Sequence, residues 1–167
     1  MNCCINETEA DEPLSATDIH AVTLEKCKSC QTSGRPVTRK TMMLMLKPDR
    51  FELIGSGRYQ FCAGVGCPIV YFTDGDGATF STNDVRLRVG GKDGCDPVPL
   101  CYCFGFDEIH ARAEIATTGQ CTIPKRISAL IKEGMCECAS RNPSGVCCLG
   151  DVNKAIQALL IEAEVHA

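Results

Sequence analysis

The stretch Cys62-Ala63-Gly64-Val65-Gly66-Cys67-Pro68 carries two cysteines on a glycine-rich turn. Its glycines and its proline prevent a helix or a strand from continuing, so a tight loop presents both thiols. A second pair, Cys27 and Cys30, precedes this stretch, with 31 residues between Cys30 and Cys62. Two turns that each present two thiolates are the arrangement that fills a tetrahedral zinc site. The sequence therefore predicts a structural zinc site formed by Cys27, Cys30, Cys62 and Cys67, with four unrelated buried cysteines as the alternative.

Cysteine is unusually frequent, at fourteen of 167 residues. Such a density is typical of a small secreted disulfide scaffold or of a metal-rich intracellular protein. Residues 1–9 show neither the basic region nor the apolar run of a signal peptide, and no stretch is apolar over the length that spans a bilayer. We therefore expect a soluble cytoplasmic protein with no membrane span, whose paired cysteines bind metals. A mature secreted chain is the alternative.

The charge pattern argues against nucleic-acid binding. The net charge is −4, and the seventeen basic residues are spread along the chain. A protein that reads nucleic acid carries its basic residues on one face or stripe. We therefore expect no nucleic-acid partner.

The composition divides the chain into two halves of different character. Short strand-like patterns precede the glycine- and proline-rich residues 90–99, and helical patterns follow them. The expected fold class is α+β, a small zinc-binding β domain followed by a helical domain. The expected segments are a flexible acidic tail over 1–20, the β domain over 21–91, a linker over 92–99 and the helical domain over 100–167. Strands are expected at 37–46, 51–54, 59–62, 69–73, 78–81 and 85–89, and helices at 107–118, at 122–134 and from about 151 onward.

Further cysteines of the helical half fall in loops at the expected helix ends. They are Cys101 and Cys103, Cys136 and Cys138, and the adjacent Cys147 and Cys148. A Cys-x-Cys pair serves either an iron–sulfur cluster or zinc, so the spacing alone leaves the metal open. A Rieske centre is excluded because it needs two paired histidine ligands, whereas His20, His110 and His166 are each isolated.

Two segments of this half resemble a known family. They are Val98-Pro99-Leu100-Cys101-Tyr102-Cys103 and, after a helix pair, Cys138-Ala139-Ser140-Arg141-Asn142-Pro143-Ser144-Gly145-Val146-Cys147-Cys148. Together they resemble the N-terminal domain of CopZ-type copper chaperones. The cysteines of the predicted zinc site, with Val70-Tyr71-Phe72 after the second pair, are similar to the first half of that domain. The resemblance covers residues 24 to about 160.

The resemblance implies a zinc site in a small β domain, joined to a helical [2Fe–2S] domain similar to bacterioferritin-associated ferredoxin. It implies that the cluster ligands are Cys101, Cys103, Cys138 and one of the last pair, for which we select Cys148. Cys136 is the alternative to Cys138, and Cys147 is the alternative to Cys148. In the family, such a domain reduces Cu(II) and passes Cu(I) to an appended domain with a Met-x-Cys-x-x-Cys motif. No such motif follows position 148, so delivery would need a separate partner.

Two functions follow as hypotheses. In the first, the protein handles metals, and the cluster reduces a soft metal ion, Cu(II) to Cu(I). Thiols such as Cys3, Cys4 or Cys147 then bind the Cu+ ion. A separate protein donates electrons or accepts the metal. In the second, it is a simple one-electron carrier with incidental spare cysteines, such as an inert Cys95 and a buried Cys121. A second zinc in place of the cluster is a third reading. No conventional catalytic site is recognisable, so an enzymatic role would be limited to copper reduction by the cluster. Because the linker separates the two metals, we expect zinc loss to leave the cluster largely intact.

Overall fold

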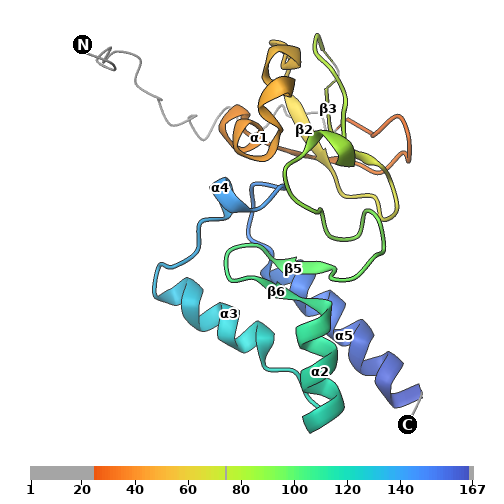
Figure 1. The fold of residues 1–167 in the computed structure, drawn as a ribbon, viewed down its shortest axis with the longest axis vertical. Coiled ribbons are helices and arrows are strands. Elements are labelled where there is room, and N and C mark those ends of the chain that lie inside the picture. Colours follow the sequence, from red (N-terminus) through yellow and green to blue (C-terminus); the bar gives the residue numbers. More distant parts are fainter. Residues whose placement is uncertain (1–24, 74, 166–167) are drawn as a thin grey trace.

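The computed structural model describes residues 25–73 and 75–165. The expected acidic tail with Cys3 and Cys4 lies outside these residues, as does His166. Figure 1 shows the sheet and helix α1 at one end of the molecule, and helices α2, α3 and α5 at the other. Helix α4 lies between the two groups, next to α1.

The first half is built on a four-stranded antiparallel sheet in the order β1-β2-β3-β4. Its strands are β1 (Gly34–Pro36), β2 (Tyr59–Cys62), β3 (Ile69–Thr73) and β4 (Phe80–Ser81). In the register, Gly34 lies opposite Cys62. This pairing places the end of β2, with its cysteine, beside the segment that follows Cys30. The strands expected at 59–62 and 69–73 are confirmed, and the one expected at 78–81 is shortened to β4.

The strand expected at 37–46 is wrong, because this segment contains the helix α1 (Arg39–Met45). The Thr38 side chain caps the helix by accepting the N–H of Thr41 at 3.1 Å. Thr41, Met42, Met45 and Leu46 are buried, whereas Met43 and Leu44 are about two-fifths exposed. This period of three to four residues is that of a helix with one face on a core.

Two other expected strands are also wrong. Residues 51–54 fall mostly in the 3₁₀ helix η2 (Pro48–Leu53), which begins with a proline, a residue suited to the first turn because it lacks an N–H. Residues 85–89 form no strand; within them, Val85 makes one isolated bridge to Leu46. A second 3₁₀ helix, η3 (Thr82–Asp84), precedes them and is closed by a capping box between Ser81 and Asp84.

Side chains of β3 contribute to two different clusters. Val70 and Tyr71 lie in the apolar core, packed with residues of α1 and the neighbouring strands. Phe72 packs instead with the cysteines of the predicted zinc site. Strand β3 therefore joins the apolar core to the metal site.

The second half consists of a short hairpin and four helices. They are β5 (Pro99–Cys101), β6 (Phe106–Asp107), α2 (Glu108–Thr118), α3 (Ile123–Lys132), α4 (Cys138–Arg141) and α5 (Leu149–Val165). The three expected helices are confirmed, with α5 beginning two residues early, and the hairpin was not expected. Helix α5 buries Val152, Ile156 and Leu159, which are three to four residues apart and share one face of the helix. These side chains pack against α2, α3 and β5 and form a second core.

Both ends of α2 carry residues typical of helix ends. The Asp107 carboxylate accepts the N–H of His110 at 2.9 Å, which caps α2. Gly119 ends the same helix with a φ of 71°, a left-handed conformation that glycine adopts without strain. Asp107 is both the last residue of β6 and the cap of α2, so the β5–β6 hairpin lies directly at the N-terminus of α2.

Candidate metal centres

The first cysteine set is brought together as one quartet. The sulfur atoms of Cys27, Cys30, Cys62 and Cys67 all lie within 4.8 Å of one another. Cys30 Sγ lies 3.5 Å from Cys62 Sγ, and Cys27 Sγ lies 4.0 Å from Cys67 Sγ. A tetrahedral zinc ion with Zn–S bonds of about 2.3 Å holds its sulfurs about 3.8 Å apart. The donor set therefore fits zinc, and four thiolates leave no coordination position open for a substrate.

Glycines allow the second turn to approach the first. A Cβ atom on Gly64 would lie 2.6 Å from Cys30 Sγ, so a larger residue would push the two turns apart. Gly66 has a φ of 69°, which other residues rarely adopt. The first turn is closed by the Gln31 N–H, which donates to the Cys27 carbonyl at 2.7 Å. Both turns thus direct their thiols toward one point.

Hydrogen bonds and burial shift the pKa values of two thiols of this set in opposite directions. Bonds from the Thr32 hydroxyl and backbone N–H lower the pKa of Cys30 to about 6. Burial raises the pKa of Cys62 to about 12. At neutral pH Cys30 is therefore a thiolate, while the buried Cys62 thiol must lose its proton when a metal binds.

Lys92, which no sequence pattern marked, is 5% exposed beside this site. Its Nζ donates to the carbonyl oxygens of Gly64 at 3.1 Å and Ile69 at 2.8 Å, on either side of Cys67. The ammonium also lies 5.6 Å from the centre of the Phe61 ring and favours the thiolate form of Cys62. A lysine in a glycine-rich linker carries no signal for such a role.

The second cysteine set is arranged as two pairs. Cys103 Sγ lies 3.7 Å from Cys138 Sγ. Cys101 and Cys148 are both buried and share a thiol–thiol hydrogen bond, which lowers the pKa of Cys101 to about 6 and raises that of Cys148. Burial raises the pKa of Cys138 to about 12, partly opposed by a bond from the Cys148 backbone N–H. That bond also joins the two pairs.

This arrangement differs from that of the first set. Among the described residues, the quartet around Cys27 is the one group of three or more such side chains with all ligand atoms within 4.8 Å of one another. A two-iron cluster needs two thiolates on each iron, and two adjoining pairs meet that requirement. The donor set of Cys101, Cys103, Cys138 and Cys148 therefore fits such a group.

The alternative thiols are placed differently. Cys147 is exposed, whereas the neighbouring Cys148 is 6% exposed. Cys138 is the thiol found against Cys103, and Cys136 is half-buried two residues before it. Cys121 lies 3.7 Å from a Glu114 carboxylate oxygen, and burial raises the pKa of its thiol.

Comparison with known proteins agrees with this geometry. Residues 24–86 match the family model of the CopZ zinc-binding domain. This segment, which holds all four cysteines of the first set, is therefore similar to CopZ-type zinc-binding domains. The copper chaperone CopZ of Archaeoglobus fulgidus is 28% identical to this chain over 124 residues, which are 74% of this chain and 57% of that relative. The chain thus spans about 57% of the length of that relative.

The resemblance extends to a solved structure. The X-ray structure of the N-terminal domain of the Archaeoglobus fulgidus CopZ matches with a TM-score of 0.66 at 27% identity. The match covers 78% of this chain and 97% of that domain. The resemblance inferred from the cysteine motifs is therefore confirmed. Among the described residues, no helix has the length and apolar character to cross a membrane.

Proposed function

We propose that this protein is a redox-active metal-handling protein that reduces Cu(II) to Cu(I) and binds the product for delivery to a separate protein. The observation that carries the proposal is the pair of adjoining thiol pairs formed by Cys101 with Cys148 and Cys103 with Cys138. Similarity to a protein named copper chaperone supports copper as the substrate. The first set, a closed quartet, has a structural role in this proposal.

The four thiols of the second set would hold a [2Fe–2S] cluster, which supplies one-electron transfer when bound. Backbone N–H groups surround these sulfurs. The Glu137 N–H donates to Cys103 Sγ at 3.4 Å, and the N–H groups of Cys103 and Phe104 donate to Cys101. Such donors stabilise negative charge on sulfur, so they favour the more negative, reduced form and raise the reduction potential.

Copper is the substrate in this scheme. One Cu(II) ion accepts one electron from the reduced protein and becomes Cu(I), and a separate electron-donating protein restores the reduced state. Thiolates prefer the softer Cu(I), so the exposed Cys147, next to Cys148, is suited to bind it. Cys3 and Cys4 offer a further pair outside the described residues. The reducing cytoplasm is the compartment that keeps such thiols free.

The experiment combines metal analysis with a stoichiometric copper reduction. Anaerobic purification should give about two irons, two sulfides and one zinc per chain. Protein reduced with dithionite and desalted is then mixed with one equivalent of Cu(II), beside a chromophore specific for Cu(I). Loss of one electron per cluster with one Cu(I) formed is expected. A cluster that stays reduced, or reoxidises without Cu(I), would leave a simple one-electron carrier; a colourless protein with two zinc ions would exclude the cluster.

A further inference from the structure

The loop before Cys147 and Cys148 is attached to the core of the first half. The Tyr71 hydroxyl of β3 donates to the Pro143 carbonyl at 2.7 Å, and Tyr71 is fully buried. Burial also raises the pKa of Tyr71, so the hydroxyl keeps the proton that it donates. The following residue, Phe72, packs against the cysteines of the zinc quartet. One strand therefore contacts both the zinc site and the loop of the second set.

The helix that carries Cys138 is attached in the same way. The Thr41 hydroxyl of α1 donates to the Ala139 carbonyl at 2.8 Å, one residue after Cys138. Thr41 is 1% exposed, and its hydroxyl also lies 2.8 Å from the Thr38 hydroxyl, which fixes its orientation. Helices α1 and α4 pack together around this bond.

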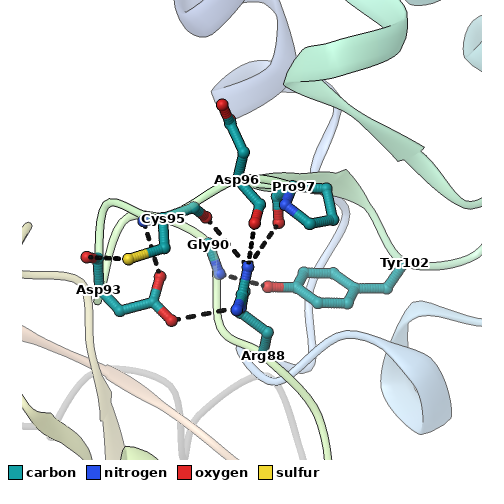
Figure 2. Close-up of polar contacts among 7 residues, drawn as sticks. All are labelled: Arg88, Gly90, Asp93, Cys95, Asp96, Pro97 and Tyr102. Atoms are coloured by element: carbon teal, nitrogen blue, oxygen red, sulfur yellow. Dashed lines mark hydrogen bonds and ion pairs between the residues drawn. The ribbon is translucent and has the colours of Figure 1, made fainter.

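The hairpin that carries Cys101 and Cys103 is the third attached segment. Tyr102, between these two cysteines, accepts the Gly90 N–H at its hydroxyl oxygen at 2.7 Å (Figure 2). A Cβ atom on Gly90 would clash with the Pro99 carbonyl oxygen, so the two backbones are in close contact.

The connecting residues between the halves are themselves held by hydrogen bonds. Figure 2 shows Arg88 at the centre of this loop. Its guanidinium donates to the carbonyl oxygens of Cys95 at 3.1 Å and Asp96 at 2.7 Å, and forms an ion pair with Asp93 at 3.2 Å. Next to it, the Gly91 carbonyl accepts the Gly66 N–H of the zinc turn at 2.7 Å. The connection therefore touches the zinc turn on one side and the hairpin on the other.

From these contacts we propose that Tyr71 and Thr41 are positioning residues for the second metal centre, so that the zinc-binding half holds the loops of Cys138 and Cys148 in place. The identity of the metal there rests on the proposed function, but the positioning does not. This proposal replaces the sequence-based expectation that zinc loss leaves the cluster largely intact.

The physical reason is the cost of an unmet buried acceptor. Without the Tyr71 hydroxyl, the buried Pro143 carbonyl loses its hydrogen-bond partner. The open form of the loop, in which water supplies that hydrogen bond, therefore becomes more populated. Local opening exposes the thiols that the loop carries, so metal leaves through the open form. A tenfold increase in the open population gives a tenfold faster metal release.

The test compares Tyr71→Phe with Tyr59→Phe in the full-length, zinc-loaded protein. Tyr59 is the matched control, because its hydroxyl accepts the Gly55 N–H at 3.2 Å within the first half. We expect Tyr71→Phe to accelerate amide hydrogen exchange over residues 139–148 by about tenfold and to accelerate iron release, measured with dithionite as reductant and a ferrous chelator, to a similar degree. The visible circular dichroism of the cluster should change as well. Tyr59→Phe should change none of these.

Thr41 provides an independent pair of variants. Thr41→Val removes the hydroxyl and should also accelerate exchange near Ala139 and metal release, whereas Thr41→Ser keeps the hydroxyl and should restore both. Unchanged exchange in Tyr71→Phe, or faster exchange without faster metal release, would overturn the positioning role.

The result of this positioning test can be judged separately from the test of the proposed function. If the wild-type protein contains no iron, the proposed function fails. Hydrogen exchange then still reports the positioning, and release is followed for the metal that occupies the second set.

Discussion

Cys103 Sγ and Cys138 Sγ lie 3.7 Å apart, although 35 positions separate them in the chain. The contact joins the hairpin before α2 to the short helix α4, across the whole α2–α3 pair. The local structure of the hairpin or of α4 does not by itself bring the two sulfur atoms together. Their meeting therefore depends on the packing of the second core and on the attachment of α4 to α1.

The pairing gives a direct prediction for the visible spectrum. Serine in place of Cys101, Cys103, Cys138 or Cys148 should abolish the cluster absorption or shift it strongly, because each replacement removes one of four iron ligands. Cys121→Ser should leave it unchanged, since this thiol contacts Glu114 rather than the second set. Absorption spectra of the anaerobically purified variants make the comparison.

The alternatives have their own signature. A normal spectrum in Cys138→Ser would transfer its role to Cys136, and a normal spectrum in Cys148→Ser would transfer its role to Cys147. The matching double variant, with serine at both Cys136 and Cys138 or at both Cys147 and Cys148, would then be colourless.

A zinc-site variant tests the coupling of the two halves. Binding of a structural zinc supplies about 10 kcal/mol, more than the ~5 kcal/mol stability of a small domain. We expect Cys62→Ser to lose zinc, to unfold the first half and to accelerate iron release. Zinc analysis, thermal unfolding and iron release are measured together, with the exposed Cys95→Ser as control. A fully intact cluster after zinc loss would favour two independent domains.

Zinc affinity should fall as the pH falls. The pKa of Cys62 is raised to about 12, so zinc binding displaces this proton throughout the neutral range. One displaced proton lowers the binding constant about tenfold per pH unit. The pKa of Cys30 is lowered to about 6, so below pH 6 its proton competes as well and the dependence becomes steeper. Competition with a chromophoric chelator between pH 5 and pH 8 measures the slope, after correction for the protonation of the chelator. A flat profile would contradict a buried, protonated thiol in the metal-free site.

Lys92 should stabilise the turn that carries Cys67. Lys92→Met keeps the length of the side chain but removes the charged donor from the carbonyl groups of Gly64 and Ile69. We expect the free energy of unfolding to fall by about 2 kcal/mol, and zinc affinity to fall with it. Lys125→Met, at an exposed position of α3, serves as control in denaturant unfolding. Equal effects of the two substitutions would show that the buried bonds contribute nothing.

Local patterns predicted the second half of the fold better than the first. Asp107, Gly119 and the apolar stripe of α5 are signals that act within one helix, so the sequence was sufficient for them. Residues 42–46 are all apolar, so periods of 2 and of 3.6 residues both fitted, and Thr38 as a helix cap was the signal that went unused. The strands β5 and β6 are too short to produce a pattern.

The metal sites show the same division between local and long-range information. The spacing was enough to nominate Cys27, Cys30, Cys62 and Cys67, because each pair sits on one local turn, whereas the cysteines of the second set were nominated by the family resemblance. The pairing of Cys103 with Cys138 was not predictable, since it depends on attachments such as Tyr71 to Pro143, made by a different half of the chain. These attachments use one hydroxyl and one carbonyl each, and they leave no periodic trace in the sequence.

The last prediction concerns the fate of reduced copper. Cys147 is the exposed thiol next to the buried Cys148, and a thiolate at this place can bind Cu(I) as it forms. We expect Cys147→Ser to reoxidise its cluster with Cu(II) as the wild type does, yet to release most of its Cu(I) to a competing chelator. Cys95→Ser, which removes another exposed thiol, should retain Cu(I). Unchanged retention in Cys147→Ser would assign capture to other thiols, and a variant lacking Cys3 and Cys4 would then decide whether that pair binds the ion.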